Sequence, residues 1–208
     1  KIDNNALTSL PRLPDYLEAI EASFNQLTTL PELPESLKAL RVTDNRLSTL
    51  PELPSALEYI SVRRNQITML PVLPSSLQEL SAEMNRLSIL PELPSSLEEI
   101  CVSDNHLSEL PVLPASLKNL YVSHNQLSAL PELPVSLENL NACHNHISAL
   151  PGLPESLEYL NVSDNQLTTL PSLPAALELV DANRNRLESL PDFPAEHRSG
   201  ERVYWLIH

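Results

Sequence analysis

Histidine and cysteine are the residues of this sequence whose types and spacing could bind a metal ion. His124 and His144 lie 20 residues apart, Cys143 directly precedes His144, and His106 and His146 stand nearby in the sequence. Imidazole and thiolate are the usual ligands of zinc. We expect these side chains on an open sheet, with no loop to complete a tetrahedral site. We therefore predict no metal site and no cofactor.

Two further groups contain residue types that could do chemistry. Ser103, Asp104 and His106 are the types found in a hydrolase triad, but neighbouring side chains on one strand provide no oxyanion pocket, so we predict no catalytic residues. Cys101 and Cys143 are two repeats apart, about 10 Å in a stack of parallel strands, which exceeds the reach of a disulfide. Free thiols fit a reducing compartment such as a cytosol.

The elements that must position these residues follow from an internal repeat of 20 residues. An asparagine recurs at this spacing from Asn5 to Asn185, and pairs of prolines recur in step and account for all 20 prolines. Self-similarity at a short fixed period is typical of solenoid proteins. The predicted organisation is a partial repeat at 1–10, nine repeats at 11–190, and a C-terminal cap or linker at 191–208.

Each repeat contains one predicted strand. In the repeat at 31–50, Leu40 and Val42 alternate with Arg41 and Thr43, which is the pattern of a strand with one buried face. Strands spaced by one repeat stack in parallel, about 4.8 Å apart. A single repeat cannot bury its leucines, so neighbouring repeats must share one continuous core.

The prolines predict the opposite wall of the solenoid. The Pro31-x-x-Pro34 pattern removes backbone donors and fixes φ, which favours extended polyproline II structure and leaves little or no helix. The asparagine after each strand has donors and an acceptor for backbone groups that the turn leaves unpaired, so we expect a buried structural ladder. Its members are Asn25, Asn45, Asn65, Asn85, Asn105, Asn125, Asn145, Asn165 and Asn185.

Residues 30–47, Leu-Pro-Glu-Leu-Pro-Glu-Ser-Leu-Lys-Ala-Leu-Arg-Val-Thr-Asp-Asn-Arg-Leu, resemble the twenty-residue leucine-rich repeat of bacterial effectors delivered by type III secretion, the YopM, IpaH and SlrP class. The resemblance covers residues 1 to about 194, and the doubled Leu-Pro motif is specific to this class. It implies a leucine-rich-repeat horseshoe that binds a host protein in the host cytoplasm. In the IpaH and SlrP branch it also implies a ubiquitin-ligase domain downstream.

The sequence departs from that branch in two places. The Cys-x-Asp motif of the ligase is missing, since Cys101 and Cys143 both lie in repeats, so we expect no ligase chemistry in this chain. Residues 195–208 also differ from the Asn-Pro-Leu turn that usually leads into the ligase.

Both ends carry expectations of their own. The chain opens in mid-strand without a capping segment, so we expect a piece of a longer protein or a missing N-terminal cap. The segment 203–207 is expected to cover the open edge of the last repeat, with an interaction site or a link to a further domain as the alternative.

The charge of the chain limits its partners. It carries 13 Lys+Arg against 27 Asp+Glu, for a net charge of −14, so nucleic acid and membrane surfaces are poor partners. Stacked glutamates on the outer wall are expected to be solvated, with a bridging divalent cation as the alternative.

The outward side chains of the strands vary while the leucine skeleton does not, so we expect protein recognition on this concave face. Arg41, Arg63 and Arg64 are expected to form a basic patch that faces an acidic stretch of a partner, since arginine and tyrosine are favoured interface anchors. The candidate binding residues are Arg41, Tyr59, Arg63, Arg64, Glu83, Met84, Tyr121, His124, His144 and Tyr159.

The favoured hypothesis is a host-protein recognition domain, the substrate-recognition module of a secreted effector of the E3 ubiquitin ligase type. A non-enzymatic adaptor of the YopM type is the first alternative, and a weakly self-associating repeat protein is the second. The sequence downstream in the parent protein would distinguish the first two.

Overall fold

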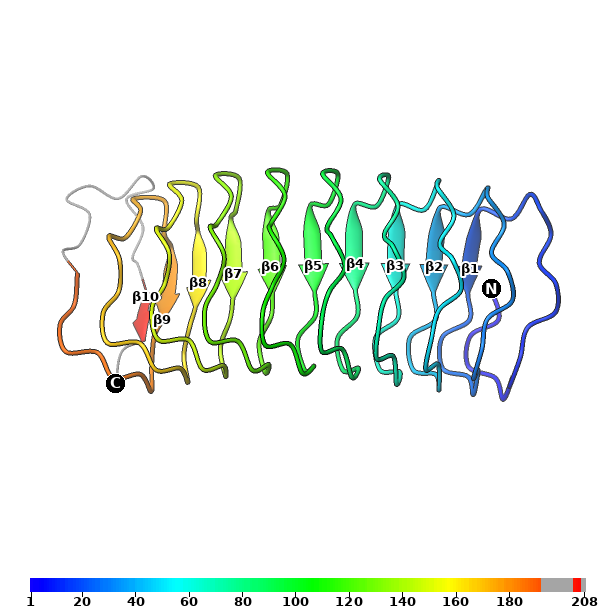
Figure 1. Ribbon diagram of the computed structural model, residues 1–208, viewed down its shortest axis with the longest axis horizontal. Coiled ribbons are helices and arrows are strands. Elements are labelled where there is room, and N and C mark those ends of the chain that lie inside the picture. Colours follow the sequence, from blue (N-terminus) through cyan, green and yellow to red (C-terminus); the bar gives the residue numbers. More distant parts are fainter. Residues whose placement is uncertain (192–203, 207–208) are drawn as a thin grey trace.

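The computed structural model describes residues 1–191 and 204–206, and the chain winds as a solenoid with one strand in each turn. We call each 20-residue turn a rung. Figure 1 shows the strands side by side in chain order, each followed by a loop that returns the chain to the next strand. The strands are β1 (Ala19–Glu21), β2 (Ala39–Arg41), β3 (Tyr59–Ser61), β4 (Glu79–Ser81), β5 (Glu99–Cys101), β6 (Asn119–Tyr121), β7 (Asn139–Asn141), β8 (Tyr159–Asn161), β9 (Leu179–Asp181) and β10 (Tyr204–Leu206).

The ten strands form one parallel sheet in sequence order. From β1 to β9 each residue pairs with the residue 20 positions further on, as Leu40 pairs with Ile60. The last strand departs from this spacing, because Tyr204 of β10 pairs with Leu179 of β9. The sheet therefore continues into the segment that we expected to cover its edge; residues 192–203 and 207–208 of the predicted cap lie outside the described residues.

The core is a single column of aliphatic side chains along the inside of the solenoid. From β1 to β9, the middle residue of each strand and the residue two positions later are buried, and Ile60 and Val62 are completely so. Leucines from the loop side, such as Leu57 and Leu77, close the core from the opposite wall. Burying one such side chain contributes about 1.5–3 kcal/mol, and every rung uses its two neighbours to do so.

The outer wall is held by a tight turn after each proline pair. The backbone N–H of Leu37 donates to the carbonyl oxygen of Pro34 at 3.0 Å, and equivalent bonds recur along the chain. Ser36 Oγ donates to the carbonyl oxygen of Leu17 on the preceding rung at 2.9 Å.

The described residues contain no helix, so the predicted leucine-rich-repeat fold with an extended outer wall is confirmed. Within this described part, nothing has the length and apolarity of a membrane-crossing helix.

The asparagines bind the main chain of successive rungs together. The backbone N–H of Leu47 donates to Asn65 Oδ1 at 2.9 Å. Asn65 Nδ2 donates to the carbonyl oxygens of Val42 at 3.0 Å and Val62 at 2.9 Å. Among the described residues no buried side-chain nitrogen or oxygen lacks a hydrogen-bond partner.

The residue before each asparagine has a left-handed backbone, which the sequence did not lead us to expect. These residues have φ between 52° and 57°, and they are Asn4, Phe24, Asp44, Arg64, Met84, Asp104, His124, His144, Asp164 and Arg184. The conformation turns the chain inward so that the asparagine enters the core. It also lets the N–H of Arg64 donate to the carbonyl oxygen of Glu83 at 2.9 Å on the next rung.

Candidate functional site on the exposed face of the sheet

The exposed face of the sheet is built from positions that repeat on every rung. The first and third residues of each strand flank its buried middle residue, and in most strands both are half-buried. The residues two and three positions after the third strand residue also face outward, and the second of them has the left-handed turn conformation. We call these four columns of side chains the sheet face. Because the register is constant, side chains of one column lie one rung apart.

At the N-terminal end of the sheet face, an arginine lies over an aromatic ring. The guanidinium carbon of Arg41 is 4.2 Å from the centre of the Tyr59 ring on the next rung. Arg41 Nη1 is also 4.0 Å from Glu21 Oε1 on the preceding rung. The predicted binding residues Arg41 and Tyr59 thus form one unit, in which each side chain limits the rotamers of the other.

The predicted basic patch is largely neutralised within the protein. Arg64 Nε is 2.9 Å from Asp44 Oδ1 on the preceding rung, and Arg41 faces Glu21. Arg63 is exposed and has no ion-pair partner among the described residues. Arg41, Arg63 and Arg64 therefore lie close together, but the exposed guanidinium of Arg63 is the one left for an acidic partner group.

The middle of the sheet face is acidic. Ser81 Oγ donates to Glu83 Oε2 at 2.6 Å, and Asn119 Nδ2 donates to Glu99 Oε2 at 3.1 Å. Cys101 lies among these carboxylates, and its burial, together with the charges of Glu83 and Glu99, raises the pKa of its thiol well above the usual range. This thiol is consequently protonated and a poor nucleophile. Met84 contributes an apolar side chain that is 39% exposed.

The sheet face over β6 and β7 is polar, and its four columns there contain no acidic residue, lysine or arginine. Asn139 Nδ2 donates to Asn119 Oδ1 at 2.7 Å, so amides are chained between β6 and β7. Tyr121 and Tyr159 are half-buried beside them. Burial and the nearby Glu99 raise the pKa of Tyr121, which keeps its hydroxyl protonated and able to donate a hydrogen bond.

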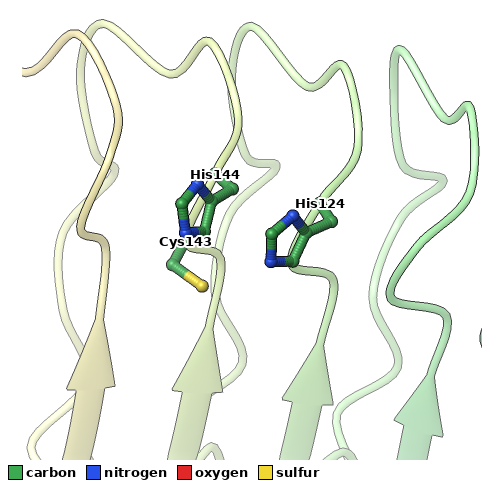
Figure 2. Close-up of side chains that lie close together, drawn as sticks. All are labelled: His124, Cys143 and His144. Carbon is green, nitrogen blue, oxygen red and sulfur yellow. The ribbon is translucent and has the colours of Figure 1, made fainter.

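His124, His144 and Cys143 come together at the edge of this polar region. The two imidazole rings are stacked, with centroids 4.2 Å apart and planes inclined by 15°. Figure 2 shows the rings on successive rungs, with the sulfur of Cys143 below the His144 ring in this view, on the side toward His124. One ligand atom from each residue lies within 4.8 Å of the other two, and no other set of three or more His, Cys, Asp or Glu is grouped in this way among the described residues.

Two residues that we did not select in the sequence extend this cluster. Asp164 Oδ2 is 3.5 Å from His144 Nε2, and Arg184 Nη1 is 3.4 Å from Asp164 Oδ1. Both occupy the left-handed column that contains His124 and His144, so reading that column in order would have found them. Burial raises the pKa of Cys143, while a hydrogen bond to Ser123 opposes this effect.

On the outer wall, two lysines occupy positions of one glutamate column and pair with its exposed carboxylates. Lys118 Nζ is 2.7 Å from Glu98 Oε2, and Lys38 Nζ is 3.5 Å from Glu18 Oε2. These pairs relieve part of the repulsion that a continuous column of carboxylates would produce.

Several solved structures resemble this chain. YopM from Yersinia enterocolitica WA-314 is 37% identical with a TM-score of 0.73, and the match covers 99% of this chain and 54% of that one. YopM from Yersinia pestis, described as a leucine-rich effector protein, is 35% identical with a TM-score of 0.61, over 93% of this chain and 74% of that one. A Shigella effector leucine-rich-repeat domain is 27% identical with a TM-score of 0.60, over 92% of this chain and 81% of that one.

Sequence comparison gives a more local result. The Leucine Rich Repeat family matches residues 156–177. No curated protein sequence matches the chain significantly. Together with the structural relatives, these findings show that the chain belongs to the leucine-rich-repeat domains of bacterial effector proteins. The chain spans about half the length (54%) of YopM from Yersinia enterocolitica, and the predicted resemblance to the effector class is confirmed.

Proposed function

We propose that this chain is the target-recognition domain of a secreted bacterial effector and that it binds a host protein through the sheet face. The observation that carries the proposal is a continuous parallel sheet whose exposed columns change in chemistry from rung to rung over an unchanging core. A rigid frame with variable outward positions favours recognition, since the residues on it can change without loss of the fold.

The anchors of this surface are its tyrosines and its exposed arginine. Tyr59 is held by Arg41, which reduces the rotamer freedom that binding would otherwise remove. Arg63 offers an exposed cation that is not paired among the described residues. A partner with an acidic segment beside an apolar surface would match Arg63 and the ring of Tyr59. The contact would extend along the sheet over the remaining candidate residues, Glu83, Met84, Tyr121, His124, His144 and Tyr159.

The proposal also covers the parent protein. We propose that this chain acts in the host cytoplasm as a non-enzymatic interaction module that selects the substrate of an E3 ubiquitin ligase domain. The likeness to the leucine-rich-repeat domain of a Shigella effector supports this arrangement. A YopM-like adaptor is the second candidate, supported by the higher identity to the two YopM structures.

Affinity capture from a host-cell lysate tests the proposal. We expect Arg63→Glu to weaken capture of the host protein at least tenfold, and the double variant with Arg64→Glu to weaken it further. Arg12→Glu on the outer wall is the matched control, because it makes the same charge reversal at an exposed arginine away from the sheet face. Equal loss in Arg63→Glu and Arg12→Glu would contradict binding through the sheet face, and so would unchanged capture in the double variant.

A further inference from the structure

We propose that His124, Cys143 and His144 bind a zinc-type transition metal ion on the sheet face. The three side chains come from two successive rungs, and one ligand atom from each lies within 4.8 Å of the others. Our interpretation of the sequence excluded a metal because no loop closes over the sheet. The structure removes that objection, since adjacent rungs place three ligands together without a loop.

The donor set selects the class of metal. Two imidazoles and one thiolate suit zinc and neighbouring divalent transition metals, whereas calcium and magnesium prefer oxygen ligands. Zinc bonds of about 2.0–2.3 Å place tetrahedral ligand atoms roughly 3.3–3.7 Å apart. Ligand atoms separated by at most 4.8 Å reach that spacing by small side-chain rotations, without movement of the backbone.

The backbone already holds the ligands in place. The N–H of His124 donates to the carbonyl oxygen of Cys143 at 3.0 Å, and the N–H of His144 donates to that of Ser163 at 3.0 Å. Both histidines have the left-handed φ of their column, 52° and 53°, so their side chains leave the chain in the same direction. The two ring planes are inclined by only 15°, so at least one ring must turn about its side-chain torsions before a nitrogen lone pair of each histidine can point to the same metal ion.

A carboxylate lies beside one ring nitrogen of His144, which would make it an outer-sphere partner of a metal ion held by the other ring nitrogen, Nδ1. Asp164 Oδ2 is 3.5 Å from His144 Nε2, and Arg184 lies 3.4 Å from the other carboxylate oxygen. With a metal on Nδ1 of His144, Nε2 would keep its proton and donate a hydrogen bond to Asp164. Carboxylates in this position orient ligating histidines and increase their affinity for metal.

The site has three protein ligands, so a fourth coordination position stays open. In zinc proteins with three protein ligands that position takes a water molecule or an exogenous donor. Because the site lies on the sheet face, a histidine, cysteine or carboxylate of a bound protein could complete the coordination. That extension rests on the proposed function, whereas metal binding by the isolated chain does not.

Titration of the metal-free, reduced chain, carrying no histidine tag, tests the proposal. Calorimetry with zinc chloride should give one equivalent of bound metal, and cobalt(II) should produce a thiolate-to-metal charge-transfer absorption. Cys143→Ser should remove that absorption and weaken zinc binding more than tenfold, and His124→Ala and His144→Ala should each weaken binding by a similar factor. Asp164→Asn should keep the absorption and weaken binding about tenfold.

The chain supplies matched controls. Cys101→Ser and His146→Ala alter a cysteine and an exposed histidine outside the cluster, and both should leave the stoichiometry, affinity and cobalt spectrum unchanged. Circular dichroism identifies any variant that fails to fold, and Cys143→Ala provides a second thiol deletion. The proposal is wrong if the wild-type chain binds no zinc, or if Cys101→Ser rather than Cys143→Ser removes the cobalt–thiolate absorption. Host-protein capture can be measured in a buffer that contains a metal chelator, so failure of the metal proposal would not affect that separate test of the proposed function.

Discussion

The side-chain amide of Asn65 donates to the carbonyl oxygen of Val42, 23 residues earlier and on the preceding rung, at 3.0 Å. The same nitrogen donates to Val62 within its own rung, while its oxygen accepts from the N–H of Leu47. One buried side chain thus makes two hydrogen bonds to the preceding rung and one to its own. Because this arrangement repeats, no rung is stable without its neighbours, as expected for a solenoid.

Loss of one interior asparagine should destabilise the protein strongly. Asn105→Ala leaves the N–H of Leu87 without an acceptor and removes one of the two hydrogen bonds that each carbonyl oxygen of Ala82 and Val102 accepts. A buried group left without a partner costs about 1–3 kcal/mol, so we expect a loss of about 1–3 kcal/mol in the free energy of unfolding in urea, with a further loss from the two weakened carbonyls. The control Asn5→Ala should cost under about 1 kcal/mol, because Asn5 is exposed and bonds only within its own turn. Similar losses at both positions would contradict the ladder as a source of stability.

Truncation of a leucine should be costly in the buried core, and truncation of an apolar side chain should be harmless on the outer surface. Leu97 is completely buried, and Leu97→Ala should lower the free energy of unfolding by about 2–5 kcal/mol, since it leaves a cavity. Val112 is 86% exposed on the outer wall, and Val112→Ala should change that quantity by less than about 0.5 kcal/mol. Thermal and urea unfolding of the two variants measure this difference, and an equal effect would contradict the position of the core.

The left-handed column should impose its own residue preference. Met84 has φ of 53°, where asparagine is tolerated and a β-branched residue is strained. Met84→Asn should therefore be more stable to urea than Met84→Val by about 1–2 kcal/mol. The adjacent Glu83 has no positive φ, so the same pair of substitutions there should not show this order. An identical order at both positions would mean that side-chain polarity, rather than backbone conformation, determines the result.

The thiol of Cys101 should react slowly, and nearby carboxylates should be part of the reason. Burial, followed by the charge of Glu83, raises the pKa of this thiol, and only the thiolate attacks an alkylating agent. In a Cys143→Ser background, Glu83→Gln should lower the pKa of Cys101 and increase its rate of alkylation by iodoacetamide at pH 8 several-fold. Glu58→Gln, on the outer wall, should not change the rate, as followed by mass spectrometry. An alkylation rate that is unchanged in Glu83→Gln would show that the charge of Glu83 does not raise the pKa of Cys101.

The repeat made most of the fold predictable from the sequence. Alternation at Leu40 and Val42 predicts a strand with one buried side, and the paired prolines exclude a helix on the outer wall. These features are local and occur in every repeat, so each unit supports the prediction made from the others. The same register then places equivalent residues one rung apart, which is why the columns of the sheet face could be read before the structure.

The left-handed turns and the contacts between side chains could not be predicted in the same way. Phe24 and Met84 occupy positive φ although neither residue favours it, because hydrogen bonds between rungs determine the backbone there. The pairing of Arg64 with Asp44 depends on rotamers of long side chains, which periodicity does not specify. For the same reason the columns indicated that His124 and His144 are neighbours, but not that the sulfur of Cys143 lies within 4.8 Å of a nitrogen of each ring.

Radical footprinting of tyrosines in a complex with the captured host protein tests recognition by the sheet face most directly. Tyr59, Tyr121 and Tyr159 lie on that face, whereas Tyr16 is 81% exposed on the outer wall and serves as an internal control. We predict that the partner lowers oxidation of the three sheet-face tyrosines and leaves Tyr16 unchanged. Protection of Tyr16 with no change at Tyr59, Tyr121 and Tyr159 would show that the outer wall binds the partner.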